Sequence, residues 1–185
     1  MEYKYELIRS SRKTICAEIK LECGLIVRAP YSATQKDIDR FLSENSAFIE
    51  KHLSKLEKSE RAAESLGHLT AEELQALADE ALEYIPQRVK YYSGIIGVKV
   101  TRVTIRNQKT KWGSATSQGH LNFNCLLMLA PKEVADSVIV HELCHLKYMN
   151  HSEKFYSEVY KYFPEYDKWN KWLKENGGIL LKRMI

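Results

Sequence analysis

The sequence predicts an α+β protein, in which strands and helices follow one another in separate blocks. Short runs of alternating apolar and polar residues over 3–29 are typical of strands. After them, apolar residues that recur at intervals of three and four indicate amphipathic helices. With 185 residues, 44% of them hydrophobic and 28% charged, the chain can bury a core and has an ordinary globular composition.

The first part of the chain, residues 1–67, is expected to be rich in β-strands and to end in a helix. The strands run as far as Pro30, with a turn at Cys23-Gly24. Because a proline lacks the N–H that a strand interior needs, Pro30 closes this block.

The helix of the first part carries its apolar residues over 38–56 at helical spacing. The stretch SATQ, at 32–35, has the form of a capping box at its start. The polar stretch 51–67 is either the end of this helix or a connection between two parts of the chain. We therefore place a boundary near Gly67.

The second part, residues 68–185, opens with another capping box, from Thr70 to Glu73, which begins a long amphipathic helix. Strands are expected over 98–106, where residues alternate, and over 119–129. The far half of the second strand is apolar throughout and is expected to be buried on both faces.

Prolines mark two of the helices in this part. Pro86 lies inside the first helical pattern and is expected to kink it, whereas Pro131 suits the first position of a new helix. Two more helices are expected, over 152–163 and 165–176, the last of which ends at Asn176-Gly177-Gly178.

The segment HELCH, residues 141–145, falls on the helix that follows Pro131 and has the form HExxH. Residues four apart on a helix are separated by about 40° around the axis, so His141 and His145 can reach one metal ion together. Glu142 lies about 100° around from His141, too far to be an easy ligand but close enough to act on a water beside the ion. The pattern therefore indicates two metal ligands and one general base.

A catalytic zinc ion usually takes three protein ligands and leaves one position for water, so a third ligand is needed. His151 is the first candidate. In a continuous helix it would lie about 240° around from His145, on the wrong side. The hypothesis therefore predicts a helix break at 149–150, where Asn150 tolerates the left-handed backbone of a helix end.

Glu165 is the rival third ligand, because a second helix can offer a carboxylate to the ion. Pro164 directly before it favours a helix start there, which leaves Glu165 near a helix terminus. We favour His151, and the residues alone leave both open.

Five segments of the chain form a recognisable set: TKWGSATSQGHLNFNCLLMLAP, VIVHELCHLKYMNHSEKFY, RSSRKTICAEI, GLIVRAP and KWLKENG. With these segments the sequence resembles the YgjP-like metallopeptidase family over nearly its whole length. The resemblance implies a zincin-like, more narrowly gluzincin-like, catalytic core that binds Zn²⁺ through His141, His145 and His151, with Glu142 as the base. The family is similar in its zinc motif to the SprT-type and WLM-type proteases, which act on proteins crosslinked to DNA.

Two positions depart from related patterns. The family commonly has a cysteine after KWGS, where Ala115 stands here, so no thiol is given a role there. The spacing of the third histidine is similar to that of metzincins, but Tyr148 stands where those proteins carry a glycine. We therefore do not assign the chain to the metzincins.

The implied chemistry is hydrolysis of peptide bonds in a protein or peptide substrate. Zinc would polarise a water and the scissile carbonyl, and Glu142 would take the proton of the water and pass it to the leaving amine. The strand at 119–125 is the expected edge to which an extended substrate adds. Tyr148, Tyr156 and Tyr160 are candidates for the oxyanion donor by proximity alone, and packing roles are expected for each.

Other histidines and the cysteines are expected to have structural roles. Cys144 is one turn from His141 but suits the buried face of its helix, and His120, His52 and His68 receive no function. No two of the four cysteines form a CxxC pair, so we expect reduced thiols, with Cys125 and Cys144 packed inside.

Charge and hydropathy bound the partners. A net charge of +4 permits an acidic partner without arguing for one. The basic stretches at 9–13 and 106–112 raise DNA association as an alternative, although Trp112 is expected to pack the core. No apolar run approaches the roughly 20 residues of a membrane span, and the start of the chain is unlike a signal peptide. We therefore expect a cytoplasmic protein.

The competing function from another class is a zinc-stabilised binding module that is not an enzyme.

Overall fold

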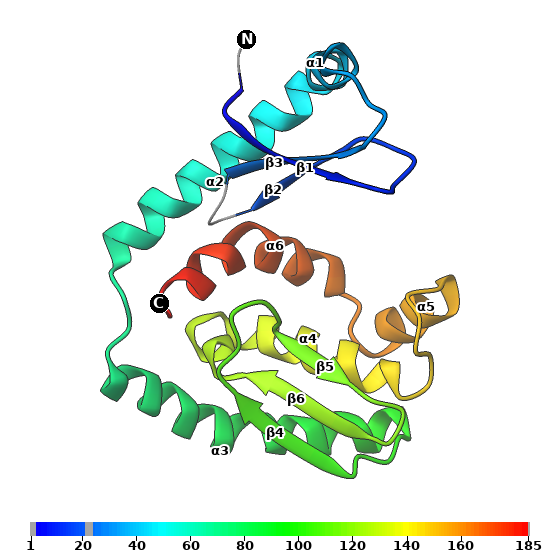
Figure 1. Cartoon of the computed structure of the whole chain (residues 1–185). Helices are drawn as coiled ribbons and strands as arrows, with labels where there is room; N and C mark the ends of the chain where they lie inside the picture. The colour runs from blue at the N-terminus through cyan, green and yellow to red at the C-terminus, as the bar shows by residue number, and fades with distance from the viewer. Residues whose placement is uncertain (1–2, 21–23, 185) are drawn as a thin grey trace. The chain divides into compact units, whose positions relative to one another are not determined.

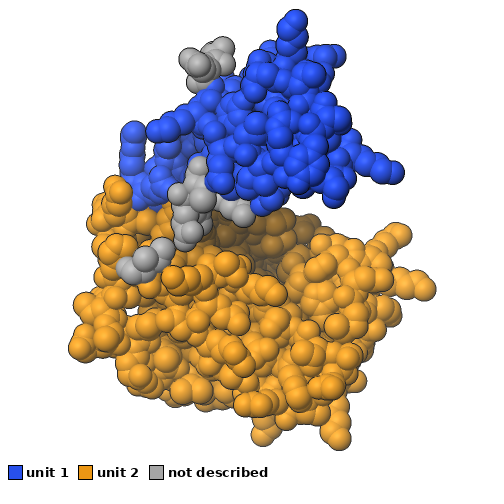
Figure 2. All heavy atoms as spheres, viewed as in Figure 1, with its two compact units in different colours: residues 1–62 blue, residues 63–185 orange. Residues whose placement is uncertain are grey.

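The computed structural model describes residues 3–20 and 24–184 of the chain. The chain divides into two compact units, residues 1–62 and 63–185, which Figure 2 colours separately. Each unit has its own three-stranded sheet and its own buried core. The predicted mixture of helices and strands is therefore confirmed, with six α-helices and two small sheets in the described residues.

The first unit is a small sheet with a helical segment after it (Figure 1). In the sheet, β3 is central, β1 pairs with it in parallel and β2 in antiparallel orientation. Leu25, Val27 and Ala29 of β3 are buried against Ile38 and Ile49 of the helices, because alternate residues of a strand face the same side. The elements are β1 (Tyr5–Ser10), β2 (Cys16–Lys20), β3 (Gly24–Pro30), α1 (Gln35–Glu44) and α2 (Ser46–Leu66).

The helical segment of this unit differs from the prediction in two ways. The capping box is formed by Thr34 and Asp37 rather than by the stretch SATQ: the Asp37 N–H donates to Thr34 Oγ1, and the Thr34 N–H donates to the Asp37 carboxylate. The helix is also interrupted at Asn45 and then continues to Leu66, so the polar stretch 51–67 is helical almost to its end. Of the expected turn at Cys23-Gly24, Cys23 lies outside the described residues.

The second unit consists of α3, a three-stranded sheet and three further helices (Figure 1). In the sheet β6 is central, β4 pairs with it in parallel and β5 in antiparallel orientation. In Figure 1 α3 and α4 lie behind the sheet, with α3 in contact with β4 and α4 with β5. The elements are α3 (Ala71–Ile96), β4 (Arg102–Arg106), β5 (Gly113–Ala115), β6 (His120–Asn124), the 3₁₀-helix η1 (Cys125–Leu129), α4 (Lys132–His145), α5 (Glu153–Tyr162) and α6 (Tyr166–Lys182).

The start of α3 confirms the predicted capping box. The Glu73 N–H donates to the Thr70 hydroxyl, and the Thr70 N–H donates to the Glu73 carboxylate. The helix continues through Pro86 and ends at Gly97, whose φ of 75° is left-handed. Only glycine adopts that backbone readily.

The strand expected over 119–129 ends at Asn124, and the residues after it form the 3₁₀-helix η1. Asn124 is fully buried and turns the chain: its Oδ1 accepts the Leu126 N–H at 3.1 Å, and its Nδ2 donates to the carbonyl oxygens of Gln108 and Lys111. The apolar run is therefore buried, as expected, but as a helix.

The last helix, α6, passes through Gly177 and Gly178 instead of ending there. Gly177 is buried, and a Cβ on it would lie 3.1 Å from two ring atoms of Trp112. The glycine therefore serves the close approach of α6 to Trp112, which packs against the core as predicted. No left-handed helix end is needed at this position.

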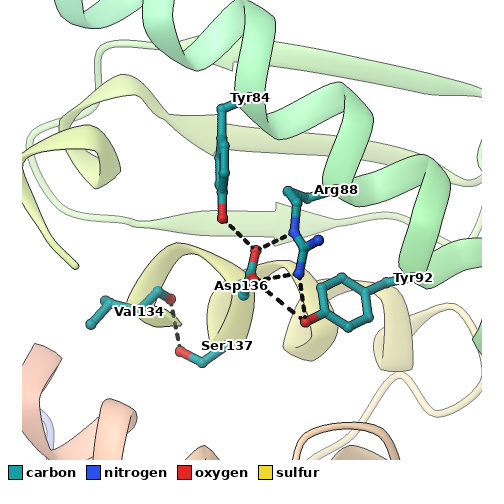
Figure 3. Close-up of polar contacts among 6 residues, drawn as sticks. All are labelled: Tyr84, Arg88, Tyr92, Val134, Asp136 and Ser137. Atoms are coloured by element: carbon teal, nitrogen blue, oxygen red, sulfur yellow. Dashed lines mark hydrogen bonds and ion pairs between the residues drawn. The ribbon is translucent and has the colours of Figure 1, made fainter. Parts of the chain in front are cut away.

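A buried carboxylate fastens α4 to α3 (Figure 3). Asp136 of α4 is 8% exposed and accepts two hydrogen bonds from the Arg88 guanidinium, at 2.8 and 2.6 Å. The hydroxyls of Tyr84 and Tyr92 donate to the same carboxylate at 3.0 and 3.4 Å. Because α4 is buried on most sides, a charge on it requires such partners.

The described cysteines agree with the expectation of reduced thiols. Cys16, Cys125 and Cys144 are free thiols, and the last two are buried. In the part of the chain that the structure describes, no helix combines the length and the apolar character needed to cross a membrane.

Candidate metal centre

His141 and His145 lie side by side at the end of α4. Their ring centroids are 4.8 Å apart and their Nε2 atoms 3.2 Å apart, as the spacing of one helical turn requires. The helix ends at His145, so both rings project at the point where the chain leaves the helix.

His151 returns to the same point after the helix has ended. Its Nε2 lies 3.1 Å from Nε2 of His141. The predicted break at 149–150 is wrong in position, since the helix already ends at His145 and Leu146 caps it. Asn150 does not adopt the left-handed backbone considered for it, because none of the described non-glycine residues has a positive φ. A tight turn replaces it, in which the N–H groups of Lys147 and Tyr148 both donate to the Cys144 carbonyl.

The three histidines offer nitrogen atoms that lie within 4.8 Å of one another, and they form a group that could hold a metal ion. Tetrahedral zinc with Zn–N distances of about 2.0 to 2.1 Å places its nitrogen ligands about 3.3 to 3.4 Å apart. The separations of His141 Nε2 from the Nε2 atoms of His145 and His151, 3.2 and 3.1 Å, are close to this requirement, and the third pair lies within 4.8 Å. The residues present therefore fit a tetrahedral ion with three imidazole ligands.

The charge state of the imidazoles also suits a metal. Burial, and to a smaller extent the charges of His145 and His151, together lower the pKa of His141 to about 3. Burial likewise lowers the pKa of His145. Both rings are consequently neutral at pH 7, which is the form that coordinates a metal ion.

Two of the three rings are held by a hydrogen bond at the nitrogen that faces away from the group. His145 Nδ1 is 3.0 Å from the backbone carbonyl oxygen of Tyr148. His141 Nδ1 is 2.8 Å from the hydroxyl of Tyr166, the first residue of α6. The sequence analysis missed Tyr166, although the neighbouring Glu165 was considered; the only available signal was its place at the start of a predicted helix.

Glu142 lies on the same helix and is 7% exposed. Burial raises the pKa of its carboxyl to about 7, against the opposing charge of Lys111. The side chain lies directly over Gly113 of β5: a Cβ there would be 2.8 Å from both Cγ and Oε1 of Glu142. Gly113 thus leaves the space that Glu142 occupies, and the sequence analysis missed it because its partner is distant in the chain.

A pocket of about 240 Å³ opens beside His141 and Glu142. Trp112 and Gly113 form one wall, and Tyr166 and Leu173 of α6 contribute to another. The two predicted functional residues therefore border a space that a side chain of a bound molecule can enter.

The remaining candidates lie outside the histidine group. Glu165 precedes α6 and forms an exposed ion pair with Lys168 at 3.1 Å, so the structure does not bring it to the histidines. Cys144 is fully buried in the core, as predicted, and burial raises the pKa of its thiol to about 12. His120 lies on β6 and His52 on α2, where its Nδ1 is 2.8 Å from the Phe48 carbonyl oxygen.

The three tyrosines considered as oxyanion donors have other contacts. Tyr160 donates its hydroxyl to the Asp167 carboxylate at 3.0 Å, and Tyr148 contributes its backbone carbonyl to His145. Tyr156 packs with its ring centroid 6.1 Å from that of His151. These contacts agree with the packing roles that the sequence favoured.

The sequence pattern of the YgjP-like metallopeptidase domain matches residues 67–176, more than half of the chain. The chain belongs to the YgjP-like family. A metallopeptidase of this family requires a metal ion, and the three histidines are the group in the described residues 3–20 and 24–184 that could hold it.

Two further comparisons accompany the family match. The crystal structure of the metallopeptidase zymogen of Pyrococcus abyssi abylysin is similar to this YgjP-like chain, with 23% sequence identity and a TM-score of 0.44. The similarity covers 49% of this chain and 93% of that chain. No curated protein matches the sequence.

Two arginines of the basic stretches bond to residues of their own units. Arg9 donates to the backbone carbonyls of Pro30 and Ala33, and Arg106 donates to the side chain of Asn122. These arginines therefore hold loops and strands of their own units. DNA association, which the sequence raised as an alternative, finds no support in the family match of this YgjP-like chain.

Proposed function

We propose that the chain is a zinc-dependent metallopeptidase that hydrolyses peptide bonds in a zincin-like, gluzincin-like core. One observation carries the proposal: three Nε2 atoms converge at the end of α4, beside a buried glutamate that borders a pocket. Two neutral imidazoles of the set suit a borderline metal such as zinc. The family match supports the peptidase class.

His141, His145 and His151 would hold the ion. When bound, zinc supplies Lewis-acid polarisation of a water molecule and of the scissile carbonyl. Glu142 would accept the proton of that water and deliver it to the leaving amine. Its burial supports this role, because a carboxyl whose pKa is raised to about 7 can both take up and release a proton near neutral pH.

The substrate would bind along β5 rather than β6. The predicted edge at 119–125 is wrong, since β6 is the central strand and pairs on both sides. β5, residues Gly113–Ala115, is the outer strand next to α4 and begins directly over Glu142. An extended peptide could add to this edge through backbone hydrogen bonds and place one side chain in the adjacent pocket.

The binding-module alternative is not favoured. A purely structural zinc site usually has four protein ligands, whereas the group in the described part of the chain offers three. A structural site also needs no buried carboxylate next to its ligands. Three ligands leave one position of the ion for water, and the buried Glu142 next to them can act as the base.

The test compares the metal content and the casein cleavage of the wild type, His151→Ala and Glu142→Gln. We expect about one zinc per chain in the wild type and in Glu142→Gln, and loss of zinc in His151→Ala. Cleavage should fall about 10²- to 10⁴-fold in Glu142→Gln, because the general base is lost. Zinc retained by His151→Ala would refute the ligand set, and full activity of Glu142→Gln would refute the base.

A parallel assay with single-stranded DNA tests the DNA-associated alternative, for which cleavage would need the nucleic acid.

A further inference from the structure

We propose that Tyr166 is a positioning residue of the metal centre: its hydroxyl accepts the Nδ1–H of His141 and so directs the Nε2 lone pair toward the ion. The inference rests on the proposed function and deepens it, because it assigns to α6 a part in metal binding. No role for Tyr166 follows from the HExxH motif itself.

The contact is short and enclosed. The Tyr166 hydroxyl oxygen is 2.8 Å from Nδ1 of His141, and the two rings are almost parallel, with an interplanar angle of 13°. Tyr166 is 5% exposed, so water does not compete freely for this hydrogen bond. A hydrogen bond in such surroundings is stronger than one in water.

The tautomer follows from metal binding. A neutral imidazole carries one hydrogen, on Nδ1 or on Nε2, and a ligand that binds through Nε2 must carry it on Nδ1. The Nδ1–H then needs an acceptor, which the hydroxyl oxygen of Tyr166 supplies. His145 Nδ1 has the same arrangement with the Tyr148 carbonyl. Two of the three ligands are therefore oriented by a hydrogen bond at the nitrogen that does not face the ion.

The backbone fixes Tyr166 where it can perform this role. Tyr166 begins α6, and its N–H donates to the Phe163 carbonyl across the turn that contains Pro164. Its ring also packs against the rings of Tyr156 and Tyr160, at centroid distances of 6.4 and 6.1 Å. These contacts, none of which involves a metal ion, hold the hydroxyl next to His141.

Tyr166 does not qualify as an oxyanion donor. Its hydroxyl bonds to the ring nitrogen that faces away from the converging Nε2 atoms, so the imidazole of His141 lies between the hydroxyl and the ion site. An oxyanion donor must instead reach the reacting carbonyl at hydrogen-bond distance. The role is to hold a ligand rather than to touch the substrate.

The experiment uses Tyr166→Phe, which removes the hydroxyl and keeps the ring. The matched control is Tyr84→Phe, which removes a partly buried hydroxyl that also bonds to α4, through Asp136, at 3.0 Å. The dissociation constant for zinc is measured in the full chain by competition with a chromophoric chelator. The unfolding temperature of each metal-free protein and the visible spectrum of each cobalt-loaded protein are recorded beside it.

We expect Tyr166→Phe to bind zinc about 10- to 100-fold more weakly, the usual effect of losing a hydrogen-bond partner of a metal ligand. Its cobalt spectrum should change, and Tyr84→Phe should bind zinc as the wild type does. A Tyr166→Leu variant separates packing from hydrogen bonding. If Tyr166 has a packing role alone, Tyr166→Leu should bind zinc weakly and Tyr166→Phe should bind it as the wild type does.

Three outcomes would overturn the inference. Zinc affinity of Tyr166→Phe within about threefold of the wild type would show that the hydroxyl is not needed. Equal losses in Tyr166→Phe and Tyr84→Phe would indicate general loosening of α4 instead. A wild-type chain that binds no zinc would refute the proposed function itself. If the wild type binds zinc, either of the first two outcomes refutes only the role of Tyr166.

Discussion

At the scale of single residues, Gly113 provides a direct test of the position of Glu142. A methyl group in Gly113→Ala would lie 2.8 Å from Cγ and Oε1 of Glu142, so the glutamate must move. Displacement of a reacting group by about 1 Å can cost about 10²-fold in rate. We therefore expect casein cleavage to fall by at least about tenfold, with zinc content unchanged.

Gly94→Ala is the matched control, because a Cβ at Gly94 meets nothing within 4 Å and its helical backbone accepts alanine. This variant should keep full activity and gain slightly in stability. Wild-type cleavage by Gly113→Ala, measured beside Gly94→Ala, would show that Glu142 either relaxes without effect or is not the base.

The sequence could predict those site residues whose placement is local. Helix geometry alone brings His141 beside His145, and it requires the helix to end before His151 can join them. Tyr166 and Gly113 could not be found in this way. Each acts on a residue that is distant in the chain, and only the packing of α6 and β5 against α4 creates these contacts.

At the scale of elements, one partly buried charge pair adds to the apolar contact between α3 and α4. Asp136→Ala would leave the Arg88 guanidinium without its carboxylate, and we expect a loss of about 2 to 3 kcal/mol in the free energy of unfolding. The side chain of Arg88 is 30% exposed, which keeps this loss below that of a fully enclosed pair. Urea unfolding of the metal-free proteins measures it.

The control for this prediction is Glu165→Ala, which breaks an exposed pair with side-chain exposures of 61% and 64%. Exposed pairs contribute about 0 to 1 kcal/mol. If Asp136→Ala destabilised the chain no more than Glu165→Ala does, the network in Figure 3 would not hold α4 in place.

Sequence patterns predicted where elements exist better than where they end. Apolar periodicity identified α3, because burial of one helix face gives its apolar residues a helical spacing. The ends depended on single side chains with tertiary partners. Asn124 stops β6 by bonding to two backbone carbonyls, and Gly177 lets α6 continue against Trp112.

At the scale of the whole molecule, each of the two units has a core of its own. The core of the first unit gathers around Val27 and Ile38, and that of the second around Phe123 and Leu143. The three histidines, Glu142 and Tyr166 all lie in the second unit. Zinc binding should therefore stabilise the unit that holds its ligands.

The placement of all the ligands in one unit leads to a prediction about metal removal. At a free zinc concentration about 100 times the dissociation constant, binding adds about 2.7 kcal/mol to the stability of the unit that binds it. Hydrogen exchange measured with zinc and with a chelator should slow in peptides from α4 and α6, while peptides from α1 serve as the internal reference. His151→Ala should abolish the difference. Equal protection of α1, or none in α4, would contradict the assignment of zinc to this site, because a ligand stabilises most strongly the structure that must be formed for it to bind.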